Sequence, residues 1–243
     1  MHQRIDKWCA ARTGGLLNNL HINEVDDESA TLLVANYFNG RWIQEFDKEE
    51  TKEEPFHGGT SSKVDMMNKT EHERTFSYAK LDDYSMLEIP YVGGYELYLI
   101  LPDRVDGLTA LLQSLDGSKI RYAMSCLKSY DRLYTKIPKF KVDYTFKASE
   151  YLTSLGISKM FSYNSELTRI QSIPMKIIEI LQSTKVILDE DGTRAGALTS
   201  TSFATLSSRS DPTEVYFYAD HPFAYIIADP FGNYCFMGTF RGS

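Results

Sequence analysis

The sequence has few cysteines and no clustered metal ligands. Its three cysteines, Cys9, Cys126 and Cys235, lie far apart and include no C-x-x-C pair. This spacing supports neither a disulfide framework nor a zinc knuckle, so we expect the three to be small buried hydrophobic residues. The five histidines never fall at the i, i+4 spacing that lets two of them share a metal ion on one helix face. We therefore predict no metal site.

The chain also lacks an excess of positive charge and any long apolar segment. Its 33 acidic residues outnumber its 26 basic residues, which gives a net charge of -7. Such a chain has no surplus of cations to neutralise a phosphate backbone or an anionic membrane, so nucleic acid and membrane are poor candidate partners. No apolar run approaches the ~18 residues that a membrane-spanning helix needs. Residues 1–6 contain no apolar core of a signal peptide.

Catalytic motifs are missing as well. The sequence contains no G-x-S-x-G nucleophile elbow, no G-x-x-x-x-G-K phosphate loop and no G-x-G-x-x-G fingerprint. Two acidic pairs, Asp26-Asp27 and Asp82-Asp83, lie in polar stretches typical of solvated turns rather than of a general acid and base. We find no catalytic constellation, so we predict neither an enzyme nor a bound cofactor.

The residues that are present favour β-strands. A helix is expected over residues 3–20, breaking at Gly14-Gly15. Residues 30–42 form a nearly continuous apolar run, which predicts a strand in the middle of a sheet. Residues 86–102 read as two apolar strands around a Gly93-Gly94 hairpin turn. A second hairpin is predicted at the C-terminus, from strands at 223–228 and 234–240.

The middle of the chain adds a strand over 134–142, in which Pro138 argues for a sheet edge or a strand start. A short amphipathic helix follows over 146–155 and ends at Gly156, and residues 177–188 form another apolar strand. Strands and helices do not alternate as in a βαβ fold. The pattern therefore indicates an α+β protein.

Residues 190–210 differ from the rest of the chain. They contain no proline and are rich in Gly, Ala, Ser and Thr, without a core pattern. Loops of about twenty residues inside a compact domain are unusual and tend to be functional or disordered. Function is therefore expected to lie in this loop.

Six segments, in order along the chain, carry a resemblance to a known family. They are Tyr37-Phe38-Asn39-Gly40-Arg41-Trp42, Val64-Asp65-Met66-Met67, Leu87-Glu88-Ile89-Pro90-Tyr91 with Leu101-Pro102, Ile137-Pro138-Lys139-Phe140, Asp189-Glu190-Asp191-Gly192-Thr193 and Ala219-Asp220-His221-Pro222-Phe223. All of them are similar to segments of the serpin family, and the resemblance runs from about Ile5 to the end.

The resemblance implies a fold and a domain plan. It implies one serpin domain over residues 1–243, with a large, mostly antiparallel central sheet, smaller sheets and peripheral helices. Met1 aligns after the family's first helices and first strands, so these are expected to be absent and the chain to be truncated. We expect the full-length parent to be extracellular or in the cell envelope, and the shortened chain to self-associate through exposed apolar residues such as Leu32.

It also implies a mechanism. Serpins offer a reactive-centre loop, here about 190–212, as bait for a protease. After cleavage the loop inserts as an extra strand into the central sheet and traps the protease. The alternative is a serpin-fold binding protein whose loop is merely cleavable, and the loop's composition alone would also allow a flexible linker.

The hinge of this loop is expected at its N-terminal end, in Glu190, Gly192, Thr193, Arg194, Ala195, Gly196 and Ala197. With a period of two, Thr193, Ala195 and Ala197 share one face, and the only charge up to the bait bond, Arg194, lies on the other. The family often has Glu where this chain has Arg194, and alanines where it has Gly196 and Leu198. Both departures could slow insertion.

The sheet-opening region is expected to include Trp42, Val34 and Gln182. The family usually places a hydrogen-bonded Asn and His at the last two positions. Here both partners are changed, which leaves no orphaned donor but removes the usual gating contact.

The bait bond is expected at Leu206-Ser207, because the scissile residue of the family lies about seventeen positions along when Glu190 is counted as the first. A leucine there suits a serine or cysteine protease with an apolar primary pocket. The alternative is Arg209-Ser210, which would suit trypsin-like enzymes.

Overall fold

The computed structural model describes residues 7–11, 15, 28–60, 62–163, 165, 167, 169–170, 175–192 and 214–242. It divides into two compact units, residues 1–38 with 141–186 and residues 39–140 with 187–243. Residues 7–11 are helical. Among the described residues, no helix is both long and apolar enough to cross a membrane.

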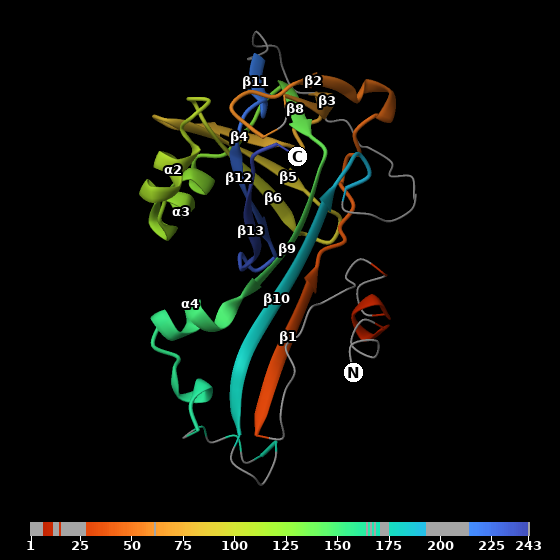
Figure 1. Ribbon diagram of the computed structural model, residues 1–243. Coiled ribbons are helices and arrows are strands. Elements are labelled where there is room, and N and C mark those ends of the chain that lie inside the picture. The colour runs from red at the N-terminus through yellow and green to blue at the C-terminus, as the bar shows by residue number, and fades with distance from the viewer. Residues whose placement is uncertain are drawn as a thin grey trace. The chain divides into compact units, whose positions relative to one another are not determined.

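The first unit contains a three-stranded sheet in the order β1 (Ser29–Tyr37), β10 (Lys176–Leu188), β9 (Phe140–Lys147). The long strands lie side by side in Figure 1. β1 and β10 run parallel, in register from Ser29 opposite Lys176 to Tyr37 opposite Lys185, with one irregularity at Ala30/Thr31. α4 (Ala148–Ser154) follows β9, and η2 (Lys159–Phe161) comes next. A small core joins Ile177 and Ile180 to residues of α4.

The second unit contains a six-stranded sheet in the order β13-β12-β6-β5-β4-β7. Its strands are β4 (Ser77–Lys80), β5 (Tyr84–Pro90), β6 (Glu96–Pro102), β7 (Lys128–Ser129), β12 (Phe223–Ala228) and β13 (Tyr234–Phe240). The pairings are antiparallel. Helices α2 (Leu108–Ser114) and α3 (Gly117–Ser125) bury Leu108, Leu111 and Ile120 against Met86 and Ile100 of this sheet.

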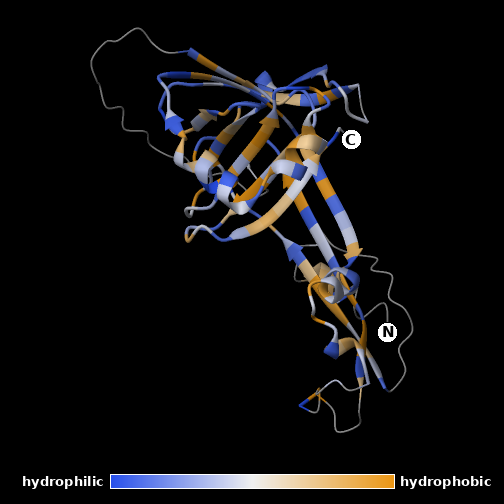
Figure 2. Cartoon of the chain, turned by 90° about the vertical axis from the view of Figure 1, so that its left-hand side faces the viewer, coloured by the Kyte–Doolittle hydropathy of each residue, from blue (hydrophilic) through white to orange (hydrophobic). Residues whose placement is uncertain are grey.

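A four-stranded sheet completes the second unit, in the order β11-β8-β3-β2. Its strands are β2 (Lys52–Pro55), β3 (Lys63–Glu71), β8 (Arg132–Pro138) and β11 (Glu214–Tyr218), and the 3-10 turn η1 (Lys48–Glu50) precedes β2. β11 and β8 are parallel, whereas β8, β3 and β2 are antiparallel. In Figure 2 polar and apolar residues alternate along several strands, as expected where one face is buried.

Several predictions are confirmed. The fold is α+β with mostly antiparallel sheets. β5 and β6 form the predicted hairpin, in which Gly93 and Gly94 both have positive φ, a backbone conformation that favours glycine. β12 and β13 form the C-terminal hairpin. The helix before Gly156 is α4, and Gly156 ends it with φ 89°.

Other predictions were wrong. The strand expected over 30–42 ends at Tyr37, and β1 is an edge strand of its sheet among the described residues. Leu32 is 46% exposed, since β1 has a neighbouring strand on one side only among the described residues. The prediction failed because an apolar run indicates burial but does not specify how many strands flank it. Pro138 was expected at a sheet edge or a strand start. It is instead the last residue of β8, which lies between β11 and β3, and β9 begins two residues later. Cys9 is buried, but Cys235 is exposed.

Candidate functional site

The predicted hinge begins with a tight turn directly after β10. The Asp189 amide donates to the Gly192 carbonyl at 2.9 Å, and the Gly192 amide donates back to the Asp189 carbonyl at 3.2 Å. Gly192 has φ 121°, and a Cβ atom there would lie 2.4 Å from the Gly40 carbonyl oxygen. Only glycine fits, because both the backbone angle and the close approach exclude a side chain.

The turn is bound to the segment that carries Trp42. The backbone amide of Trp42 donates to the Asp191 carbonyl at 3.3 Å, and that of Phe46 donates to the Glu190 carbonyl at 2.9 Å. The indole Nε1 of Trp42 donates to the Asp189 carbonyl at 2.9 Å. Trp42 is buried and stacks on Tyr91, with ring centroids 4.2 Å apart. Its ring therefore fixes the turn through both packing and hydrogen bonding.

Glu190 is the buried charge of this turn. Its Oε1 accepts from Thr51 Oγ1 at 2.8 Å, its Oε2 lies 3.1 Å from Lys139 Nζ, and its side chain is 5% exposed. Burial alone would raise the pKa of Glu190, but hydrogen bonds from Thr51, its own backbone amide and Lys139 outweigh burial and lower the pKa. The carboxylate is thus ionised and held in place from two sides.

The remaining charges of the turn lie nearer the solvent. Lys48 Nζ is 2.8 Å from Asp191 Oδ2, and this hydrogen bond raises the pKa of Lys48. Burial, followed by the neighbouring Asp191 charge, raises the pKa of Asp189. An exposed pair such as Lys48 and Asp191 contributes little to stability, so Glu190 is the main electrostatic anchor of the turn.

The structure brings some predicted site residues together. Trp42, Glu190 and Gly192 form one cluster in the second unit. Val34 and Gln182 are direct register partners on β1 and β10 in the first unit. The rest of the predicted hinge (Thr193, Arg194, Ala195, Gly196 and Ala197) and both candidate bait bonds (Leu206-Ser207 and Arg209-Ser210) lie outside the described residues.

Sequence reasoning missed the partners of Glu190. Lys139 belongs to the segment 137–140 that was noted for its resemblance, but nothing in the pattern links it to a carboxylate 51 residues later. Thr51 lies in a polar stretch and gave no signal. These contacts depend on tertiary structure alone.

β10 is held differently by its two neighbours. Toward β9, Glu179 pairs with Lys147 at 2.7 Å, Lys185 pairs with Asp143 at 3.3 Å, and Ser183 Oγ accepts from Thr145 Oγ1 at 2.9 Å. Toward β1, the partner strand Ser29–Tyr37 contains no charged residue. β1 therefore cannot form ion pairs with β10. The two strands pair through their backbones, and most side chains of β1 are apolar.

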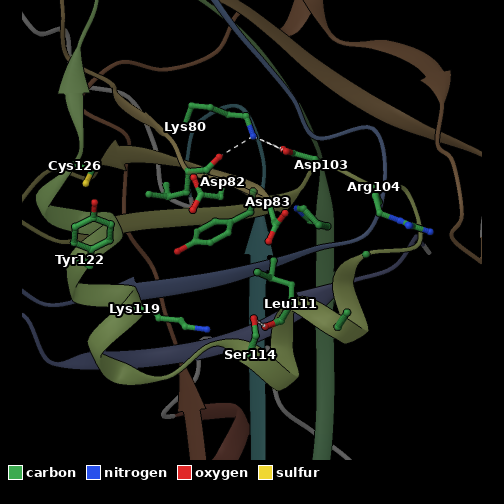
Figure 3. A pocket seen from close by; sticks show the side chains of 15 residues that line it. Lys80, Asp82, Asp83, Asp103, Arg104, Leu111, Ser114, Lys119, Tyr122 and Cys126 are labelled. Atoms are coloured by element: carbon green, nitrogen blue, oxygen red, sulfur yellow. Dashed lines mark hydrogen bonds and ion pairs between the residues drawn. The ribbon is translucent and has the colours of Figure 1, made fainter.

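A separate pocket of about 690 Å³ lies between the β4–β5 turn and helices α2 and α3 (Figure 3). Asp82 and Asp83 line it and are exposed, which confirms their interpretation as a solvated turn. Lys80 at its rim bonds to Asp103 at 2.6 Å. None of the lining residues is a histidine, so the pocket holds no Ser-His pair.

Comparisons with known proteins converge on one family. Residues 1–242 match the family model described as Serpin (serine protease inhibitor). "Serine proteinase inhibitor 2" of Variola virus is 28% identical over 241 residues, covering 97% of this chain and 69% of the relative. "Serpin-ZXA" of Oryza sativa subsp. japonica is 30% identical over 253 residues, covering 97% and 62%.

The fold is also similar to that of a solved structure. The crystal structure of uncleaved ovalbumin superposes with a TM-score of 0.82 at 24% identity, covering all of this chain and 62% of that one. The chain thus spans less than two thirds of the length of the rice protein and of ovalbumin.

Proposed function

Because this chain belongs to the serpin family, we propose that its natural protein is a suicide-substrate inhibitor of serine proteases. A viral relative and a rice relative carry inhibitor or serpin names, and each matches 97% of this chain. The proposal takes residues 1–243 as part of one serpin domain, with the reactive-centre loop at about 190–212. The observation that supports it best is the unequal attachment of β10 to its two neighbours.

The loop is tethered at both ends. Its N-terminal end is bound by Trp42 and Glu190, and β11 begins at Glu214 on its C-terminal side. Between Gly192 and Glu214 lie 21 residues, in which Arg194 is the only charge up to Leu206 and Pro212 is the only proline. A loop that is anchored twice and free of proline over most of its length is suited to bait presentation and later strand formation.

Insertion would take place between β1 and β10. The chain turns back at Asp189–Gly192, so a returning strand would run antiparallel to β10 and, because β1 is parallel to β10, antiparallel to β1 as well. One parallel pairing would be replaced by two antiparallel pairings, which are somewhat more stable per residue. A dozen inserted residues at ~0.5–1.5 kcal/mol per net hydrogen bond yield on the order of 10 kcal/mol.

Parting β1 from β10 breaks no ion pair. The side chain of Val34 has no polar atom, so it forms no hydrogen bond with the side chain of Gln182 opposite, and β1 carries no charge. Parting β10 from β9 would instead break the ties of Glu179, Ser183 and Lys185. The chemistry of the sheet therefore favours opening on the β1 side.

The bait bond is proposed at Leu206-Ser207, with a target protease whose primary pocket is apolar. The test incubates the natural full-length protein with chymotrypsin-like, elastase-like and trypsin-like proteases. We expect a covalent complex that survives denaturing electrophoresis and a released C-terminal peptide that begins at Ser207. A peptide beginning at Ser210 would assign Arg209 instead, and cleavage without complex would reject inhibition in favour of a cleavable binding protein.

The 243-residue chain on its own is proposed to self-associate. β1 is the edge of the described sheet, and an edge strand with exposed apolar residues such as Leu32 is a template for pairing with a second chain. Light scattering should show oligomers, and a monodisperse monomer would reject this.

The proposed site of action, outside the cell or in the cell envelope, is checked by locating the natural protein in medium and cell fractions.

A further inference from the structure

One outward face of the four-stranded sheet is rich in tyrosine. Tyr134 of β8 and Tyr216 of β11 are register partners, and their rings stack with centroids 4.9 Å apart and planes 8° apart. Tyr218, two residues further along β11, meets Tyr216 edge-on at 5.8 Å. Tyr216 is 53% exposed and Tyr218 is 38% exposed. We call Tyr134, Tyr216 and Tyr218 the tyrosine face.

The charges around the tyrosine face neutralise one another. Arg132 pairs with Glu214 at 2.6 Å, and Lys136 pairs with Glu54 at 2.6 Å. Lys136 also lies 5.4 Å from the centre of the Tyr218 ring. The face thus presents stacked aromatic rings inside a polar rim without net charge. This is the composition of protein–protein interface centres, in which tyrosine is enriched and unpaired charge is depleted.

The short stretch of chain between the bait bond and β11 points to the target protease as the partner of the tyrosine face. β11 begins seven residues after Ser207, so an extended chain between them spans at most ~25 Å. A protease of roughly 230 residues has a radius of gyration of about 17 Å and a width of about 45 Å. The tether is shorter than the protease is wide. A protease engaged at Leu206-Ser207, or at Arg209-Ser210, is therefore held within ~25 Å of the start of β11, close enough to contact the tyrosine face.

We infer that the tyrosine face is an accessory docking surface for the target protease, beside its contact with the bait loop. This inference rests on the proposed function. Docking there would add contacts to a bound partner at high effective concentration, so it would raise the rate of complex formation without changing which bond is cleaved. A purely structural role is the competing explanation, because cross-strand aromatic pairs also stabilise exposed sheets.

The test compares Tyr216→Ala with Tyr216→Phe in the natural full-length protein. Phenylalanine keeps the ring and its stacking area, whereas alanine removes both. Tyr122→Ala is the matched control, because Tyr122 is 64% exposed and lies on helix α3, which packs on the six-stranded sheet of the same unit. For each variant we would measure the second-order rate constant of complex formation, the kcat/KM of loop cleavage and the melting temperature.

We expect Tyr216→Ala to lower the rate constant and kcat/KM about tenfold, with an unchanged ratio of complex to cleaved product. Tyr216→Phe and Tyr122→Ala should stay within about twofold of the wild type. A Tyr216→Ala variant that melts earlier but reacts at the wild-type rate would show a structural role only and overturn the inference. Wild-type cleavage without complex would reject the proposed inhibition, and kcat/KM would still test the docking surface.

Discussion

The two neighbours of β10 differ in the side-chain contacts that join them to this strand. On the β9 side, two ion pairs and a hydroxyl hydrogen bond cross between the strands. On the β1 side, the facing strand has no charged residue, and the partners at the predicted opening position are Val34 and Gln182. In the proposed mechanism, the place where a strand enters therefore depends on side-chain chemistry and not only on backbone pairing.

The largest effect is expected from the hinge. Thr193→Arg would bring a charge beneath the sheet, and Ala195→Pro would remove a ladder donor where the new strand begins. In the proposed mechanism, either change should convert the inhibitor into a substrate, with the loop still cleaved but nearly all covalent complex lost. Densitometry of denaturing gels measures the two products. An unchanged yield of complex in either variant would show that the loop does not enter next to β10.

A smaller effect is expected from the anchor of the hinge. Glu190→Ala should lower the free energy of unfolding by about 2–3 kcal/mol, because it leaves Thr51 and Lys139 without their buried partner. Urea unfolding provides the measurement. Glu53→Ala is the control, since Glu53 pairs with Lys63 on the surface, with both side chains 61% exposed, and its loss should leave stability unchanged.

The same anchor predicts a pH dependence. The folded state lowers the pKa of Glu190, so its contribution is present above the unfolded-state pKa and is lost as the pH falls through the folded-state value. The stability difference between wild type and Glu190→Gln should therefore be largest near neutral pH and shrink under acid conditions. A difference that grows toward low pH would contradict this sign.

The smallest effect is expected on the closed side of β10. Glu179→Gln removes the ion pair with Lys147, and we expect a loss of about 1 kcal/mol in unfolding free energy. The yield of covalent complex should not change, because β9 and β10 stay together in the proposed mechanism. A higher yield in this variant would show that the β9 side also takes part in opening.

Much of the fold could be predicted from local patterns. The Gly93-Gly94 turn and the C-terminal hairpin follow from glycine, proline and apolar runs, which act over a few residues. The edge position of β1 did not follow, because an apolar strand does not reveal how many neighbours it has. The loop at 190–210 could be predicted from its composition, because it is rich in Gly, Ala, Ser and Thr and shows no pattern of core residues.

The candidate site was predictable only in part. Glu190, Gly192 and Trp42 belong to segments noted from the sequence, whereas Thr51 and Lys139 meet Glu190 only through tertiary contacts. The unequal sides of β10 depend on strand order and register, which place Glu179, Ser183 and Lys185 beside β9. Strand order and register cannot be read from residue spacing within one strand.

Two cross-links, one on each side of β10, test most directly whether the sheet opens between β1 and β10. Val34→Cys with Gln182→Cys joins register partners of β1 and β10, and Thr145→Cys with Ser183→Cys joins β9 to β10. Both are made in a Cys235→Ser background, because that cysteine is exposed. Oxidised 34–182 protein should be cleaved without forming a covalent complex and recover trapping on reduction, whereas oxidised 145–183 protein should trap normally. Full trapping by the oxidised 34–182 protein would show that the loop inserts elsewhere.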